Sequence, residues 1–142
     1  MTTRAQMSES AEHDGGHTSL MRAALEGRTE AVKTSLEGGA DVNGKDDEGR
    51  TALMFAVTNI HTDSVNLLLD HGADVNATAN DGGTALMLAA SSGDSEIVRA
   101  LLSKGAYLSG RFTQTGKTAL MLAREKDYTE IAELLQAAGA EQ

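Results

Sequence analysis

One phrase returns four times along this chain at a nearly constant spacing. It reads GRTALMFA at residues 49–56, GGTALMLA at 82–89, GKTALMLA at 116–123 and, in a more divergent form, GHTSLMRA at 16–23. Its threonines stand at positions 18, 51, 84 and 118, so successive copies are 33, 33 and 34 residues apart. A fixed period of this length indicates a tandem array of helical units that pack only on their neighbours. The chain is therefore expected to fold as a solenoid.

A second phrase repeats at the same spacing as the first. It reads GADVN at residues 39–43 and 72–76 and, in a divergent form, GAYLS at 105–109. Together the two phrases resemble the ankyrin repeat family, whose repeat contains T-P-L-H-x-A-A, a second helix with I-V-x-x-L-L, and then G-A-D-V-N. The resemblance covers roughly residues 16 to 140. Two departures recur: Ala or Ser replaces the family's Pro, and a Met replaces its His at Met21, Met54, Met87 and Met121.

The resemblance implies an all-α ankyrin repeat solenoid of stacked helix-turn-helix units with projecting β-hairpin fingers. We expect a disordered tail over residues 1–15 and one repeat domain over 16–142, with repeats at about 16–45, 46–78, 79–112 and 113–142. The first and last repeats carry polar residues where the second repeat has leucines, as terminal caps require; these residues are Thr34, Ser35 and Gln136.

Each first helix is predicted to begin at the phrase's threonine, because a Thr hydroxyl can accept a hydrogen bond from the first helical turn. The helix should end at a left-handed residue, as at Gly27 and Gly93. Ile60 and Asp127 hold that position in repeats two and four. A β-branched residue is strained there, so either the turn is rebuilt at Ile60 or contacts hold it. The repeated Met position is interpreted as core, with an exposed recognition stripe as the alternative.

The composition argues against several classes of partner. The net charge is −9, whereas nucleic acids and anionic membranes call for a basic surface. With no cysteine, the chain can form neither a disulfide nor a zinc–thiolate site. The first twenty residues lack a long apolar run, which argues against a signal peptide or a membrane span. A cytoplasmic location is the default expectation.

No arrangement of residues nominates a catalytic or metal site. His13 and His17 lie beside Asp14 and could bind a metal adventitiously. The resemblance implies a structural role for His61, and His71 precedes Gly72 at a helix end, where a cation favours the helix dipole. Metalloprotease, phosphate-loop and nucleophile-elbow motifs do not occur. We therefore predict no cofactor, no metal and no enzymatic activity.

Two polar features of the fingers need a separate interpretation. The acidic run at residues 45–49 lacks the spacing of a calcium loop and is predicted to be a solvated finger tip. Asn43 and Asn76 end the GADVN phrases and are expected to hold the finger turn by local hydrogen bonds. Such asparagines in ankyrin proteins can also be substrates of asparaginyl hydroxylases.

The resemblance implies a non-enzymatic protein-binding module, an adaptor or inhibitor, that is monomeric on its own. Alternatives are a structural subunit of a permanent complex or homodimer, and a substrate of asparaginyl hydroxylation. The partner, another protein, would bind a concave face of finger tips and first helices. The candidate contacts on that face are Asp47, Glu48, Arg50, Phe55, Thr58, Asn59, Asn80, Asp81, Leu88, Ser91, Ser92, Arg111, Phe112, Thr113, Gln114, Lys117, Leu122, Glu125 and Lys126.

The third finger is predicted to be the strongest part of that face. It carries the aromatic Tyr107 and Phe112 and the basic Arg111 and Lys117, which are side-chain types that anchor interfaces. The first finger, at residues 46–48, is acidic, so the face should run from acidic to basic and orient a partner. Both aromatic side chains have an alternative: they can fold inward to fill the longer third finger.

Overall fold

Helices form in pairs, one pair for each copy of the repeated phrase. The computed structural model describes residues 16–140, so the predicted tail at 1–15 lies outside the described residues. The eight helices of this part of the chain confirm the all-α prediction. The first helices of the pairs are α2 (Ser19–Glu26), α4 (Ala52–Thr58), α6 (Ala85–Ser92) and α8 (Ala119–Glu125). The second helices are α3 (Thr29–Glu37), α5 (Thr62–Asp70), α7 (Ser95–Ser103) and α9 (Thr129–Ala137).

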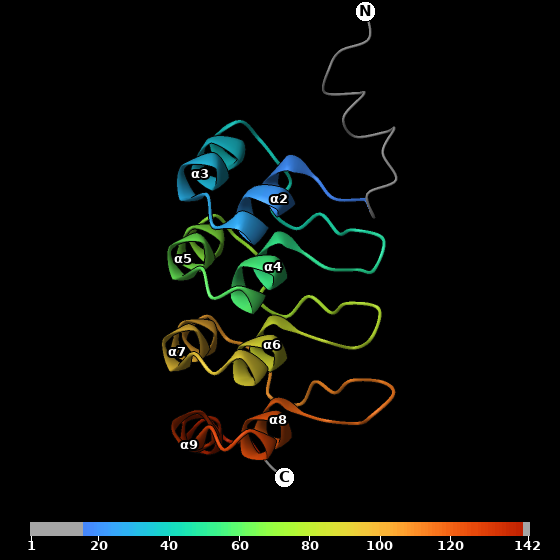
Figure 1. The fold of residues 1–142 in the computed structure, drawn as a ribbon, viewed down its shortest axis with the longest axis vertical. Coiled ribbons are helices and arrows are strands. Elements are labelled where there is room, and N and C mark those ends of the chain that lie inside the picture. The colour runs from blue at the N-terminus through green and yellow to red at the C-terminus, as the bar shows by residue number, and fades with distance from the viewer. Residues whose placement is uncertain (1–15, 141–142) are drawn as a thin grey trace, which may run out of the picture.

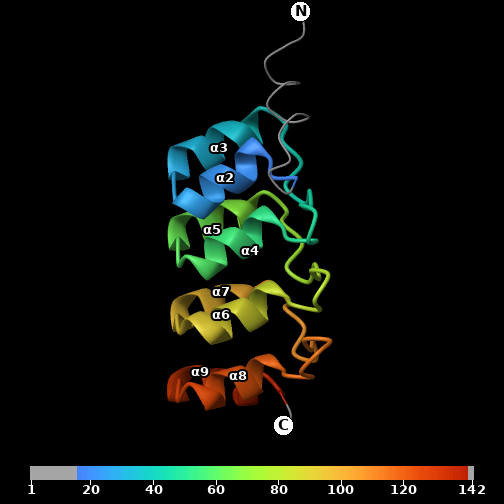
Figure 2. The same ribbon diagram turned by 45° about the vertical axis from the view of Figure 1, so that its right-hand side comes forward.

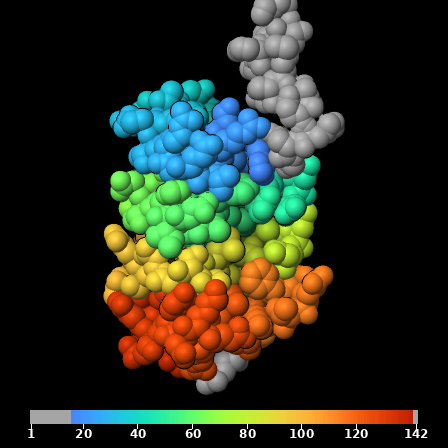
Figure 3. Space-filling view, viewed as in Figure 1, coloured from blue at the N-terminus to red at the C-terminus, as the bar shows by residue number. Residues whose placement is uncertain are grey.

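The pairs stack in chain order into three columns. The second helices form one column, the first helices the next, and the fingers project from the far side of the first helices (Figure 1). The turned view keeps the helices on one side and the fingers on the other (Figure 2). In the space-filling view the four repeats lie in contact as successive layers (Figure 3). Among residues 16–140, no helix combines the length and apolar character that a membrane span needs.

The threonines begin the first helices as predicted. Thr18, Thr51, Thr84 and Thr118 are all N-caps in extended conformation. In each case the hydroxyl accepts the backbone N–H of the methionine three residues later, at 3.2–3.4 Å. Such a bond satisfies a donor that the helix itself leaves free.

The rest of the phrase forms the core between the two columns of helices. Leu20, Leu53, Leu86 and Leu120 expose at most 2% of their surface. Met21, Met54 and Met87 are equally buried, so at these three positions the methionine is core, not an exposed stripe. Met121 is half-buried, and it lies in the terminal repeat, which has a neighbour on one side only.

The helix-ending turns resolve the question raised by Ile60. Gly27 and Gly93 take the left-handed conformation, with φ of 73° and 88°. Ile60 and Asp127 take it as well, with φ of 57° and 60°. The turn is therefore not rebuilt in repeat two, and the Ile60 side chain is 44% exposed. A β-branched residue in this conformation carries backbone strain.

Two of these turns are covered by a ring from the next repeat. A Cβ placed on Gly27 would lie 2.6 Å from the His61 ring, and one on Gly93 would lie 2.7 Å from Tyr128 Cζ. His61 Nε2 is also hydrogen-bonded to Leu25 O at 3.0 Å, which confirms its structural role. The matching residue of repeat three, Asp94, is short and instead caps α7 by accepting the Ile97 N–H.

Each finger is closed by backbone hydrogen bonds at its tip, but no strand forms over residues 16–140. Asp46 N donates to Arg50 O, and Ala79 N donates to Gly83 O. In the third finger the corresponding bond joins Phe112 N to Lys117 O and so spans one residue more. The residue that lengthens the last period therefore sits in this tip.

The side chains of Asn43 and Asn76 bond to the backbone of the next repeat, and they do not close the turn of their own finger. Asn43 Oδ1 accepts the Asp74 N–H at 2.7 Å, and its amide nitrogen donates to Gly72 O at 3.4 Å. Asn76 repeats the pattern with Tyr107 N at 2.7 Å and Gly105 O at 3.2 Å. The local bond expected for each asparagine exists as well, but through its backbone N–H, which Asp41 and Asp74 accept.

Candidate functional site

The fingers and the first helices form one face, which we call the finger face: the tips at residues 45–50, 78–83 and 111–117 with α4, α6 and α8. All of the predicted contact residues come from these segments or from the residue directly after a first helix. Neighbouring tips are joined. Asn80 N donates to Glu48 O at 2.9 Å, and Thr113 N donates to Asp81 O at 2.9 Å. The Asn80 side chain adds a bond to Asp47 O at 3.1 Å.

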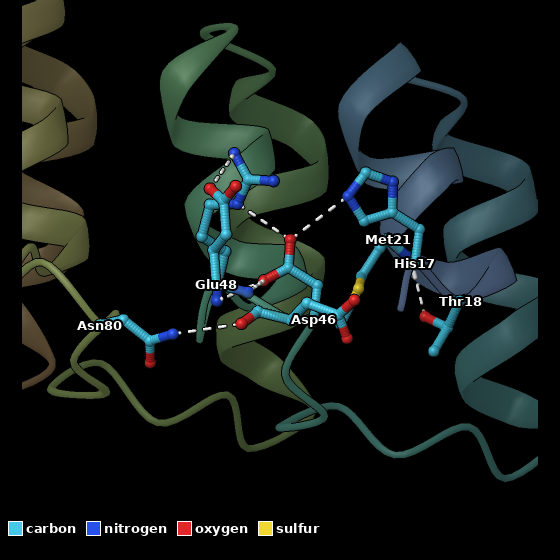
Figure 4. A network of polar contacts seen from close by, with 8 residues as sticks. His17, Thr18, Met21, Asp46, Glu48 and Asn80 are labelled. Atoms are coloured by element: carbon cyan, nitrogen blue, oxygen red, sulfur yellow. Dashed lines mark hydrogen bonds and ion pairs between the residues drawn. The ribbon is translucent and has the colours of Figure 1, made fainter. Parts of the chain in front are cut away.

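A buried carboxylate organises the N-terminal end of the finger face. The Asp46 side chain is 0% exposed, although the sequence predicted a solvated tip. Its Oδ1 accepts the N–H groups of Arg50 and Glu48 at 2.7 and 3.0 Å, and Arg50 Nε lies 2.9 Å from Oδ2 (Figure 4). Burial alone would raise the pKa of Asp46, but these hydrogen bonds and the Arg50 charge outweigh it and leave the pKa lowered.

His17 and Phe55 complete this cluster. His17 Nε2 lies 3.2 Å from Asp46 Oδ2, and Figure 4 marks this contact between the two side chains. The His17 ring meets the Phe55 ring edge-on, with 5.2 Å between the ring centroids. The Arg50 guanidinium carbon lies 4.9 Å from the Phe55 ring centroid. Phe55 is consequently only 8% exposed and lies beneath the finger face. His17 thus connects the first repeat to the first finger.

Sequence reasoning missed the roles of Asp46 and His17. Asp46 was interpreted as part of a solvated finger tip, and His17 was considered only as an adventitious metal ligand beside Asp14. One signal was present: aspartate before a tight turn commonly accepts the N–H groups that follow it. The contact between His17 and Asp46 joins two repeats, so no local pattern reveals it.

A hollow of about 290 Å³ lies between the second and third fingers. Phe112 and Leu122 give its apolar part, and Asp81, Gln114, Thr115 and Lys117 give its polar part. Phe112 is half-buried and packs against the core. Its ring lies beside Gly83, where a Cβ would stand 2.9 Å from Phe112 Cε1 and 3.0 Å from Asp81 Oδ1. The third finger therefore closes over a position that only glycine leaves open.

A second hollow of about 210 Å³ lies between the first and second fingers. It is lined by Glu48, Arg50, Ala79, Asn80 and Asp81. Asp81 borders both hollows, so they adjoin along the finger face.

The basic residues at the C-terminal end are engaged within the protein. Lys117 Nζ lies 2.9 Å from a Glu125 carboxylate oxygen. Arg111 Nη1 donates to Gly116 O at 3.1 Å, and Lys126 Nζ donates to Ser91 O at 3.0 Å. Glu125 forms an ion pair with Lys117, and Arg50 forms ion pairs with Asp46 and Glu48 in the first finger. These pairs reduce the predicted difference in charge between the acidic and the basic end of the face.

The other predicted contacts differ in accessibility. Thr58, Thr113 and Gln114 are exposed, whereas Leu122 exposes only 8% of its surface and Leu88, Ser91 and Ser92 are half-buried. The Asn59 side chain is exposed but already donates to Leu25 O and Phe55 O. Tyr107 is 69% exposed, so of its two alternatives the outward one is found.

Among residues 16–140, no three His, Asp or Glu side chains come together as metal ligands would. His13 and Asp14 lie outside the described residues. His71 Nδ1 is hydrogen-bonded to Leu67 O in its own helix.

Comparison with known proteins supplies one finding. A family model described as ankyrin repeats, in three copies, matches residues 3–79 and again 77–142. The two matches together cover almost the whole chain. No curated protein matches it.

Proposed function

Because the chain belongs to the ankyrin repeat family, whose domains are generally protein–protein interaction modules, we propose that it is a non-enzymatic adaptor or inhibitor. In this proposal it binds one protein partner through the finger face. The partner contacts are the exposed finger tips and the two hollows between them, with the first helices as a floor.

The observation that carries this proposal is the pair of adjoining hollows on the finger face. Each lies between successive fingers, and Asp81 belongs to both. The larger combines the ring of Phe112 and the side chain of Leu122 with polar groups at its edge. Interface anchors bind in such apolar pockets with polar rims. The fingers are also fastened to one another, so a partner would meet a preorganised surface.

The test compares two double variants in a pull-down from the native host. Asp47→Ala with Gln114→Ala removes exposed side chains from the first and third finger tips. Asn66→Ala with Lys104→Ala removes exposed side chains from α5 and the end of α7 and serves as the control. We expect the finger variant to bind the captured protein about tenfold more weakly and the control to bind like the wild type. Equal retention by both variants would place the binding site elsewhere.

A second candidate is a subunit of a permanent assembly, and the C-terminal end of the stack favours it. There, Ala123, Tyr128 and Ala132 of the last repeat line a hollow of about 290 Å³, together with polar residues. Sedimentation of the purified chain separates the two candidates, since the adaptor is expected to be a monomer. The permanent assembly is favoured if a dimer persists on dilution and dissociates when Ala132 is replaced by a charged residue.

A further inference from the structure

The chain already contains an arginine held between an aromatic ring and a carboxylate. The Arg50 guanidinium carbon lies 4.9 Å from the Phe55 ring centroid, and Arg50 Nε lies 2.9 Å from Asp46 Oδ2. A guanidinium is attracted to the face of an aromatic ring and pairs well with a carboxylate. This part of the finger face thus shows how such a surface holds arginine.

One repeat further on, Ala79 and Leu88 stand where repeat two has Asp46 and Phe55, but a ring and a carboxylate meet there from other positions. The residue before the threonine is Gly83 in repeat three, where repeat two has Arg50. Phe112 Cε1 and Asp81 Oδ1 both lie directly beside Gly83, at 2.9 and 3.0 Å from where a Cβ on this residue would stand. The hollow of about 290 Å³ opens beside the same two residues.

The charges around this hollow favour a cation. Asp81 is exposed, and its Oδ1 accepts the Gly83 N–H at 2.9 Å. Among residues 16–140, no cationic side chain forms an ion pair with Asp81. Lys117 also lines the hollow, but Glu125 lies 2.9 Å from its ammonium group and offsets its charge. Of the two charged residues that line this hollow, Lys117 is therefore paired with a carboxylate and Asp81 is not paired with a cation.

We infer that the hollow between the second and third fingers binds an arginine side chain of the protein partner. The guanidinium stacks on the Phe112 ring and pairs with Asp81, while the aliphatic stem lies along Leu122. Lysine fits less well, because its ammonium is a compact, strongly hydrated charge that does not stack on a ring as a plane. This inference rests on the proposed function, since it names the chemistry that the finger face recognises.

The hollow can be tested without knowing the partner. The probes are N-acetyl-arginine methylamide and its lysine and citrulline counterparts, titrated into the full chain while backbone amide shifts are followed by NMR. Arginine should shift the amides of Gly83, Phe112 and Thr115. Citrulline has the same shape without the charge and should bind about tenfold more weakly, the size expected for losing a charged hydrogen bond.

Two variants assign the effect to the carboxylate. Asp81→Asn keeps the oxygen that accepts the Gly83 N–H but removes the charge, and should weaken the arginine probe about tenfold. Asp70→Asn removes one charge from an exposed position at the end of α5 and should leave binding unchanged. The inference is overturned if the arginine probe does not shift the amides at the hollow, or if arginine and citrulline bind equally well. It is also overturned if Asp81→Asn and Asp70→Asn bind the arginine probe equally well. If lysine binds as well as arginine, the stacking of the guanidinium on Phe112 is wrong.

The outcome is separable from that of the proposed function. A captured partner that depends on the finger tips but binds Asp81→Asn as tightly as the wild type would refute the arginine site alone. A probe that binds the hollow while no protein depends on the finger tips would refute the proposed function alone.

Discussion

The ring of Tyr128 in the fourth repeat lies directly over Gly93 in the third, so close that a methyl group on Gly93 would stand 2.7 Å from Tyr128 Cζ. Gly93 also has a φ of 88°, which a residue with a side chain adopts only under strain. Two independent constraints thus coincide at one position, and both bear on the joint between two repeats.

Gly93→Ala should destabilise the protein by about 1–3 kcal/mol, because the left-handed conformation and the Tyr128 ring both oppose the methyl group. Urea unfolding measures this loss. The Tyr128→Ala background provides the control, since there only the backbone strain should remain. A loss of equal size in both backgrounds would show that the ring does not matter.

Ile60→Gly should leave stability unchanged or raise it by up to about 1 kcal/mol. Ile60 has the same left-handed turn but is 44% exposed, so glycine would relieve strain and give up little packing. The measurement is again the unfolding free energy from urea melts. A loss greater than about 1 kcal/mol would mean that the side chain contributes packing beyond what its exposure suggests.

Leu86→Ala should cost about 2–5 kcal/mol, as core truncations do, and Leu20→Ala should cost clearly less. Both side chains are buried, with 1% and 2% exposed. Leu86, in α6, lies between α4 and α8, whereas Leu20, in α2, has a neighbouring repeat on one side only and borders an open hollow. A site next to open space can relax after truncation. Equal losses would argue against the first repeat as a cap.

Asp46→Asn should destabilise the protein at pH 7, and the difference from the wild type should shrink in acid. The pKa of Asp46 is lowered in the native state, so its stabilising effect is fully present above its ordinary pKa of 3.8. It is lost as the pH falls through the lowered native value, where the wild type becomes protonated too. We expect a difference of about 1–2 kcal/mol at pH 7, since Arg50 is partly exposed and screened. Urea midpoints that differ equally at pH 7 and at the acid limit of folding would contradict this.

The sequence predicted those features that recur with the period. The threonine caps, the buried leucines and three of the four methionines lie where the repeated phrase predicted them, because each performs the same local task in every copy. The left-handed turn at Ile60 was one of two alternatives, since the sequence alone does not tell a strained residue from a rebuilt turn.

Features that join one repeat to another were harder to predict. Asp46 was interpreted as solvated, yet contacts with Arg50 and His17 bury it. Asn43 and Asn76 were assigned to local turns, but their side chains reach the following repeat. These contacts depend on which residues become neighbours after stacking. Whether the predicted contact residues bind a partner remains a prediction.

The rings that cover the glycine turns have a consequence for building new arrays from this chain. The His61 ring covers the turn at Gly27, and the Tyr128 ring covers the turn at Gly93. The short Asp94 holds the same position next to the turn at Ile60. Each fit is divided between two consecutive repeats. Copying a whole repeat into a new place would therefore separate matched halves, and could set a tyrosine against an isoleucine. The segment that can be copied without loss therefore runs from the middle of one repeat to the middle of the next, because it keeps each ring together with the turn that it covers.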